Sequence, residues 1–283
     1  MPHKLNKELF LIPNIVITNM KEITFEIGVL FPFPKTEVRL AKKELIRQLE
    51  MLLEEFEVDI FVGKAHSQRW WDVQITCLEN EKKIILSILR ASVGIKQKIH
   101  RLEKGMIILG RLVDPYNTGF GWFIDIGLEP RKDALLPLYS LRESLFNGAK
   151  VPLREITDAY GFFDKVPIQV EITKITKRKG EYNIDVKLSE EWTEQLLDWA
   201  EGENEWLIIW GTSREKLIHA LKSAGHYQDI IGIDSMDTLT HIIFLKQNTR
   251  GTGLVPRLGP HLKTAIFGVG SPTKIRELRK NYQ

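Results

Sequence analysis

Three aromatic side chains crowd one short segment that glycines bound on both sides. Phe120, Trp122 and Phe123 lie between Gly119 and Gly127. Side chains alternate along a β-strand, so we expect Phe120 and Trp122 on one face and Phe123 on the other. Exposed aromatic rings stack on nucleic-acid bases, each contributing about 1–3 kcal/mol. The segment therefore predicts a base-stacking surface or, as the alternative, rings that fill the interior of a β-barrel.

Basic residues gather at the tip of a predicted β-hairpin. Lys174, Lys177, Arg178 and Lys179 precede Gly180, and apolar runs flank this turn on both sides. Their positive charges can follow the phosphates of a nucleic acid, which would make binding depend on salt. The alternative is a charged tip that only contacts water. Beside the aromatic segment, nucleic-acid binding is the interpretation that we carry forward.

A second group of glycines and arginines stands in the last third of the chain. Arg250, Gly251, Gly253 and Arg257 are possible phosphate contacts, since backbone N–H groups and guanidinium groups both bind phosphate. These glycines do not stand between a predicted strand and a predicted helix, and the chain has no Walker sequence. We therefore expect this stretch, and residues 268–270, to form turns.

Histidines and carboxylates of the last third offer the residue types of an enzyme. His226 with Asp229 or Asp234 contains a general base and acid for RNA cleavage. This interpretation requires His226, His241 and His261 to converge in space. None of the seven histidines forms the H-x-H or H-E-x-x-H spacing of a metal site. Isolated histidines usually satisfy local hydrogen bonds, so we assign no catalytic residue, metal or cofactor.

The composition is that of a folded chain with two or three domains. It has 283 residues, of which 43% are hydrophobic and 27% charged, and a net charge of +3. Cys77 is the only cysteine, which excludes an internal disulfide and a cysteine-based zinc site and predicts a reducing, cytoplasmic location. No apolar run has the roughly 18–20 residues of a membrane span, and Met1 to Leu9 lack the apolar core of a signal peptide. We expect neither membrane insertion nor export.

Residues 1–103 are predicted to form an α+β domain. Apolar residues alternate from Ile23 to Val29 and from Trp71 to Cys77, the period of half-buried strands. Between these strands, apolar residues recur every three or four positions from Val38 to Phe56, which indicates a helix. We expect Asn80 to cap a second, shorter helix.

Residues 104–190 are predicted to form an OB-fold β-barrel. Short apolar runs alternate with glycines, and the basic turn joins the strands Val166 to Thr173 and Tyr182 to Leu188. The stretch Tyr139 to Asp164 is expected to be a helical insertion that covers one end of the barrel. Ser189 is expected to cap the helix that follows.

Residues 191–283 are predicted to form a small α+β domain with a basic tail. Strands at 207–210, 230–233 and 240–245, with a helix after the first, suggest a ferredoxin-like fold. Thr212 and Glu215 have the spacing of a capping box at the start of that helix. The tail offers a second basic arm, made of Lys274, Arg276, Arg279 and Lys280. We recognise no internal repeat in the sequence.

The central third resembles a known RNA-binding family. The runs GMIILGRLVDPYNTGFGWFIDIG, ALLPLYSL, VPIQVEITKI and YNIDVKLS are similar to the S-one domain, an OB fold first described in a ribosomal protein. The resemblance implies that Phe120 and Phe123 are the family's stacking aromatics and that Lys187 is near its basic position on the last strand. Pro137 stands where the family has a histidine, which makes Trp122 a substitute platform. The whole chain resembles an uncharacterised archaeal protein family with an S-one-like centre.

These observations lead to three hypotheses of different classes. The first is a protein without chemistry of its own that binds single-stranded or looped RNA, with ribosomal or other structured RNA as the expected target and ribosomal proteins as further partners. The second is an RNA-processing or nucleotide-handling enzyme centred on the last domain. The third is a scaffold whose barrel joins protein subunits instead of RNA. We expect no membrane partner under any of them.

Overall fold

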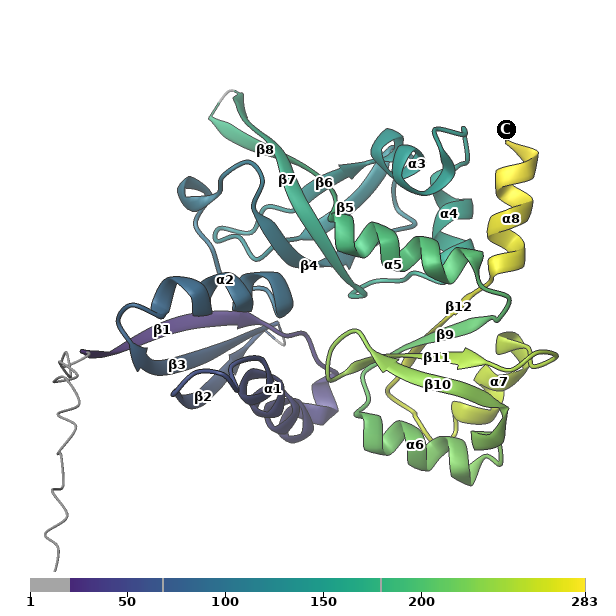
Figure 1. Ribbon diagram of the computed structural model, residues 1–283, viewed down its shortest axis with the longest axis horizontal. Coiled ribbons are helices and arrows are strands. Elements are labelled where there is room, and N and C mark those ends of the chain that lie inside the picture. The colour runs from purple at the N-terminus through teal and green to yellow at the C-terminus, as the bar shows by residue number, and fades with distance from the viewer. Residues whose placement is uncertain (1–20, 68, 179, 283) are drawn as a thin grey trace, which may run out of the picture.

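The computed structural model describes residues 21–67, 69–178 and 180–282 of the chain. These residues form three β-sheets, and the middle one closes into a five-stranded barrel (Figure 1). Helices and strands are mixed along the chain in all three parts. The predicted α+β class with a central barrel is therefore confirmed. Two predictions concern residues outside the described ranges: the absence of a signal peptide at Met1 to Leu9, and the cation of Lys179.

The first sheet is antiparallel and has the strand order β1-β3-β2. Alternate residues of β3 are buried, and they share one core with Leu45 and Leu49 of α1 and Leu89 of α2. Both helices therefore cover the same face of the sheet. The elements are β1 (Glu22–Leu30), the 3-10 helix η1 (Lys35–Glu37), α1 (Val38–Leu52), β2 (Asp59–His66), β3 (Trp70–Leu78) and α2 (Lys82–Ser92).

The barrel has the strand order β4-β5-β6-β8-β7, in which only β6 and β8 are parallel. The predicted helical insertion is present between β6 and β7, and its residues Ile156 and Tyr160 are buried in the barrel's core. The elements are η2 (Ile99–Arg101), β4 (Ile107–Val113), β5 (Gly121–Asp125), β6 (Ala134–Pro137), α3 (Leu138–Phe146), α4 (Leu153–Tyr160), β7 (Pro167–Arg178) and β8 (Glu181–Leu188).

The last sheet is antiparallel and has the order β10-β11-β9-β12, that of a ferredoxin-like unit. Every residue of β9 is buried, because α6 and α7 cover one face and helices of the barrel region cover the other. The elements are α5 (Glu190–Glu201), β9 (Trp206–Trp210), α6 (Arg214–Ser223), the 3-10 helix η3 (Tyr227–Asp229), β10 (Ile230–Ser235), β11 (Thr240–Leu245), α7 (Gly251–Leu258), β12 (Ile266–Gly270) and α8 (Pro272–Asn281).

The first and last sheets repeat one order of elements. The order β1-α1-β2-β3-α2 matches β9-α6-β10-β11-α7, and the strands pair in the same sequence, since β3 lies between β1 and β2 as β11 lies between β9 and β10. Beside β1, Val29 forms an antiparallel bridge with Ile95 at the place that β12 takes beside β9. The barrel thus stands between two units of one topology.

The turn between β10 and β11 connects all three parts of the molecule. Asp237 accepts a hydrogen bond from Nη1 of Arg111 in β4 at 2.5 Å, and Thr238 donates to Gln48 of α1 at 3.4 Å. The next residue, Leu239, belongs to the core of the first sheet. Figure 1 shows this turn reaching from the last sheet toward the barrel and the first sheet.

Two glycine-rich stretches expected to be turns are regular elements instead. Gly251 begins α7, and Gly268 and Gly270 belong to β12. A Cβ atom on Gly268 would lie 1.8 Å from the carbonyl oxygen of Gly161, and one on Gly270 would lie 2.0 Å from the ring of Trp206. Glycine is therefore needed at these positions because neighbouring groups pack too closely for a side chain, and not because the chain turns there.

Two predicted helix caps also differ by one residue. The residue that precedes α2 is Glu81 rather than Asn80, and its side chain forms no capping hydrogen bond. Ser213 caps α6 in place of Thr212, since its Oγ accepts a hydrogen bond from the backbone N–H of Lys216 at 3.4 Å. The cap predicted at Ser189 is confirmed, because its Oγ accepts from the N–H of Trp192 at 3.2 Å.

Candidate nucleic-acid interface

Two phenylalanine rings form an exposed aromatic pair at the start of β5. Phe120 is 58% exposed, and Phe123 is half-buried. Their ring centroids lie 5.9 Å apart with an interplanar angle of 89°, the edge-to-face geometry that aromatic pairs favour. The outer surface at the start of β5 therefore presents two aromatic rings that contact each other and are both accessible to solvent.

Trp122 points into the barrel and is completely buried, with 0% of its surface exposed. Its Nε1–H donates a hydrogen bond to the hydroxyl of Thr157 at 2.9 Å, and its ring meets that of Phe162 edge-on at 5.3 Å. The expected pairing of Phe120 and Trp122 on one face is thus wrong. Phe120 precedes the strand, so the alternation of β5 starts at Gly121. Trp122 is therefore a core residue and not part of the candidate surface.

Two side-chain hydrogen bonds hold the loop before β5 and so fix the position of Phe120. Tyr116 donates a hydrogen bond from its hydroxyl to Asp158 of α4 at 2.8 Å, and Thr118 donates to the carbonyl oxygen of Gly121 at 2.6 Å. Burial, together with the hydrogen bond to Asp158, raises the pKa of Tyr116 to about 12. The phenol therefore stays protonated and keeps this hydrogen bond at neutral pH.

Paired residues of five strands form one row across the outer surface of the barrel. Phe123 pairs with Val113 on one side and with Leu135 on the other, and both neighbours are half-buried. Leu135 pairs with Asp185, which in turn pairs with Lys174. The row is apolar at its centre and carries charge at the β7 and β8 end. Strand alternation predicts Leu135 for this face, although the sequence-based selection of site residues missed it.

The basic hairpin carries its cations on different sides of the ribbon. Lys174 and Lys177 are exposed, and their odd and even positions place them on opposite faces of β7. The ammonium of Lys177 lies 5.1 Å above the ring of Tyr182. Arg178 ends β7 and pairs across the ladder with Glu181. Lys174 and Lys177 therefore project from different sides of the hairpin.

Lys187 lies on β8, where the resemblance to the S-one domain implies a basic position. Its ammonium forms an ion pair with Glu171 at 2.9 Å, and the residue is exposed. Pro137, which replaces the family's histidine, is buried and ends β6. Two residues later Tyr139 is 73% exposed, a ring that the sequence-based selection also missed. The first turn of α3 thus adds an aromatic group next to β6.

The possible phosphate contacts at Arg250 and Gly251 are already occupied by a carboxylate. Glu205 accepts hydrogen bonds from Nη1 of Arg250 at 2.7 Å and from the backbone N–H of Gly251 at 2.8 Å. The side chain of Glu205 is largely buried. Gly253 and Arg257 are exposed on α7. A phosphate at the start of α7 would have to displace Glu205.

The candidate catalytic histidines have different surroundings. His226 and Asp229 form a hydrogen-bonded pair at 2.8 Å. His241 is buried, with its ring nitrogens hydrogen-bonded to Ser235 at 2.9 Å and to the carbonyl oxygen of Thr212 at 3.0 Å, and burial lowers its pKa below 6.5. Within residues 21–67, 69–178 and 180–282, no hydrogen bond links His261 to either group, and no cluster suited to a metal ion is found.

The basic tail is a docked helix rather than a free arm. Ile275 of α8 is fully buried, and Arg276 donates a hydrogen bond to the carbonyl oxygen of Gly202 at 2.8 Å. Arg279 pairs with Glu201 and donates to the carbonyl oxygen of Leu145 at 3.2 Å. Two of the four tail cations are therefore used to attach α8 to α5 and the barrel.

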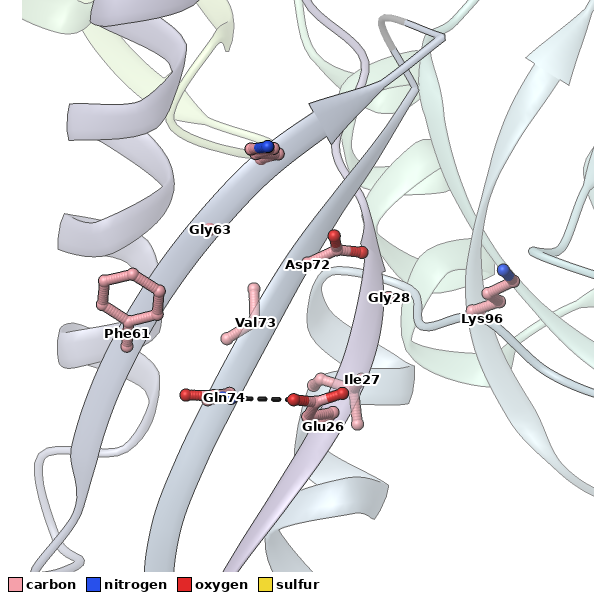
Figure 2. A pocket seen from close by; sticks show the side chains of 10 residues that line it. Glu26, Ile27, Gly28, Phe61, Gly63, Asp72, Val73, Gln74 and Lys96 are labelled. Atoms are coloured by element: carbon pink, nitrogen blue, oxygen red, sulfur yellow. Dashed lines mark hydrogen bonds between the residues drawn. The ribbon is translucent and has the colours of Figure 1, made fainter.

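A shallow depression of about 440 Å³ lies on the open face of the first sheet (Figure 2). Figure 2 shows Glu26, Asp72 and Gln74 in its middle, where the amide of Gln74 donates a hydrogen bond to Glu26 at 2.7 Å. Phe61, at its edge, is 62% exposed. The wall of this depression carries the carboxylates of Glu26 and Asp72 and the ammonium groups of Lys64 and Lys96, so it lacks the excess of positive charge that favours binding of RNA phosphates.

Two family models match the chain over consecutive stretches. Residues 102–200 match the model of the DUF2110 central domain, and residues 204–269 match the model of the DUF2110 C-terminal domain. Together these stretches cover more than half of the sequence, and the first of them contains the whole barrel. No curated protein matches the chain. Of the helices in the described residues, none has the length and apolar character to cross a membrane.

Proposed function

The chain belongs to the DUF2110 family, and we propose that it binds single-stranded or looped RNA on the outer surface of β5 and β6. OB folds bind oligonucleotides on the face of their second and third strands, helped by the loops that join strands one to two and four to five. In this barrel those strands are β5 and β6, and those loops carry Phe120 and the basic hairpin.

The exposure of Phe120 is the observation that carries the proposal. Phe120 is 58% exposed although its ring stands in edge-to-face contact with Phe123, so it stabilises little of the barrel's interior. Ring faces of this kind stack on bases of any sequence. Tyr139, which is 73% exposed, extends the aromatic surface toward α3.

The charges around these rings fit a strand whose phosphates follow the hairpin. Between residues 171 and 187 the chain has five basic and three acidic residues, which leaves an excess of positive charge. Lys174 and Lys177 are exposed and lie on opposite faces, so a bound strand contacts one or both according to its path. Each phosphate contact makes the fall of log affinity with log salt steeper by about 0.7 for single strands.

Fluorescence anisotropy with a short labelled RNA tests the aromatic surface. Phe120→Ala and Phe123→Ala should each weaken binding by about tenfold or more, because each removes one stacking partner. Phe61→Ala is the matched control, since Phe61 is 62% exposed but lies on the first sheet. Equal affinity of all four proteins would refute the proposed surface.

The hairpin is tested in the same assay by its salt dependence. Lys177→Gln should lower both the affinity and the salt slope. Lys222→Gln is its control, because Lys222 also lies above a tyrosine ring, that of Tyr227 at 5.3 Å, but on α6. An unchanged slope for Lys177→Gln and Lys174→Gln would exclude the hairpin from the path of the strand.

The resemblance to the S-one domain directs the proposal to ribosomal or other structured RNA in the cytoplasm, and so to a role in translation in an archaeal cell. A protein partner is the competing proposal, because Val113, Phe123 and Leu135 form an apolar row. A protein contact on this row would be lost in Leu135→Lys, whereas RNA affinity would be kept or raised by the added charge.

A further inference from the structure

A cavity of about 300 Å³ lies where the first sheet, the barrel and the end of the helical insertion meet. Four cationic side chains line it, and they come from different segments: Arg69 before β3, Arg111 of β4, Arg131 between β5 and β6, and Lys165 before β7. Asp125 and Asp164 are the carboxylates in its wall. None of these residues belongs to the aromatic surface described above.

Arg111 is the group that sets this cavity apart. Its side chain is 3% exposed, and only Nη1 has a hydrogen-bond partner. Nε and Nη2 have none among the residues that the structure describes. A buried guanidinium with two unpaired donor nitrogens is costly, since buried polar groups are normally hydrogen-bonded.

The partner of Arg111 has no capacity left to satisfy these nitrogens. Asp237 accepts from the N–H groups of Leu239 at 2.7 Å and Thr240 at 2.6 Å, and from the hydroxyl of Thr240 at 3.0 Å. With the bond from Arg111 this makes four, the number that a carboxylate can accept in good geometry. Among the residues that the structure describes, Asp237 therefore offers no further acceptor to Nε and Nη2 of Arg111, and a bound anion would supply one.

Each of the other three cations has a carboxylate close to it. Arg69 pairs with Asp125, and Arg131 pairs with Asp133 at 3.1 Å. The ammonium of Lys165 lies 3.6 Å from Asp164, too far for a hydrogen bond, and 4.8 Å above the ring of Trp210. Because each cation has a carboxylate nearby, the unpaired donors rather than the net charge make this a site for an acceptor.

Backbone strain is concentrated on the same cavity. Ser67 and Lys165 both line it, and both adopt left-handed conformations with φ of 53° and 75°. Residues other than glycine hold such conformations at a cost of about 1–3 kcal/mol. Asp114, with φ of 41°, adjoins the cavity residue Val113 and donates its N–H to Asp164. The wall is therefore preformed by residues that the surrounding structure constrains.

We propose that this cavity binds a phosphate dianion, free or as a monoester, with Arg111 as the buried donor and Arg131 and Lys165 as the cations at its rim. A phosphate offers several acceptor oxygens and about two negative charges at neutral pH, which suits the planar donors of guanidinium groups. Two sources supply this chemistry: a free mononucleotide or inorganic phosphate, and the phosphorylated end of an RNA.

The geometry of the barrel makes the RNA end a reachable source. Arg111 pairs with Asp125 on the same outer surface on which Val113 pairs with Phe123, two residues further along the strands. The cavity therefore adjoins the proposed RNA-binding row. Only this source rests on the proposed function, because binding of free phosphate needs no RNA.

Isothermal titration calorimetry at constant ionic strength tests the site with inorganic phosphate and with adenosine monophosphate, against chloride. The wild-type protein should give saturable heat with phosphate. Lys165→Gln and Arg131→Gln should each weaken binding by about tenfold, the loss of one hydrogen bond to a charged group. Lys132→Gln is the matched control, because Lys132 neighbours Arg131 but pairs with Glu181 outside the cavity, and it should stay within about twofold.

Arg111→Lys keeps a cation beside Asp237 but removes the two unpaired nitrogens, so it should abolish saturable binding. If this variant fails to fold, as thermal unfolding would reveal, the two rim variants decide. No saturable heat for the wild type, or equal weakening by Lys132→Gln, would overturn the proposal and leave a cavity filled by water.

Two single-stranded RNAs of the same sequence, one with a 5′-phosphate and one with a 5′-hydroxyl, show which source supplies the bound phosphate. Tighter binding of the phosphorylated RNA than of the hydroxyl form supports an RNA end as the ligand, provided that Arg131→Gln removes this difference in affinity. Equal RNA affinities beside saturable phosphate binding support a free phosphate. Saturable phosphate binding in a protein that binds neither RNA would overturn the proposed RNA binding alone.

Discussion

Asp237→Asn should destabilise the protein far more than its small change in volume suggests. Asp237 is 5% exposed and its ion pair with Arg111 is almost fully buried, with side-chain exposures of 3% and 2%. The asparagine oxygen can still accept from the N–H groups of residues 239 and 240. Its NH2 group, however, would face Nη1 of Arg111, which is itself a donor.

The magnitude follows from the charge that is left behind. Removing one partner of a buried ion pair costs about 3–5 kcal/mol, because the other charge stays buried without compensation. Asp133→Asn is the matched control. It breaks the ion pair of Arg131, which is about half exposed, and such surface pairs contribute about 0–1 kcal/mol.

Urea unfolding followed by the fluorescence of the seven tryptophans measures the difference. An Asp237→Asn protein within about 1 kcal/mol of the wild type would contradict this prediction, since it would mean that water or the chain compensates Arg111 without the carboxylate.

Three further predictions follow from the core. Trp122→Phe should destabilise the protein by about 1–3 kcal/mol through the lost indole volume and hydrogen bond, yet leave RNA affinity unchanged in the anisotropy assay. Gly268→Ala should destabilise by about 1–3 kcal/mol or more in thermal melts, because its Cβ would lie 1.8 Å from the carbonyl oxygen of Gly161, whereas Gly253→Ala, with nothing within 4 Å, should not destabilise. Burial holds the pKa of His241 below 6.5, so the unfolded chain binds its proton more readily and the free energy of unfolding should decrease as the pH falls below 6.5. His241→Gln should remove that part of the pH dependence in urea titrations, and a decrease of equal size in the variant would contradict this assignment.

Sequence patterning predicted the elements whose side chains alternate or repeat clearly. Ile23 to Val29 and Trp71 to Cys77 are strands, and the basic turn joins β7 and β8 as expected. These segments are buried on one face only, so their apolar period is visible in the sequence. The same rule fails for β12, where Gly268 and Gly270 leave no side chains to alternate.

The reversed faces of Phe120 and Trp122 have a related physical cause. Alternation fixes relative faces only within a strand, and β5 begins after Phe120, at Gly121. A Cβ on Gly121 would lie 2.4 Å from the carbonyl oxygen of Leu136, so this glycine marks the point where β6 crosses closely. The sequence shows a glycine there, but the position of the strand boundary depends on the neighbouring strand.

The cavity around Arg111 could not be predicted from local patterns at all. Arg69, Arg111 and Lys165 are far apart in the sequence, and Asp237 reaches Arg111 from the last sheet. In the sequence Arg111 stands between apolar residues of a strand, where an arginine would normally point to solvent. Its burial results from the packing of three units, of which two share one topology.

Photochemical crosslinking of a short single-stranded RNA to the wild-type protein, with mass spectrometry of the attached peptides, tests most directly where RNA binds. We expect crosslinks on Phe120, Phe123 and Tyr139, whose rings lie on or beside the outer surface of β5 and β6. Crosslinks confined to the open face of the first sheet, such as Phe61, or to the last sheet would contradict it.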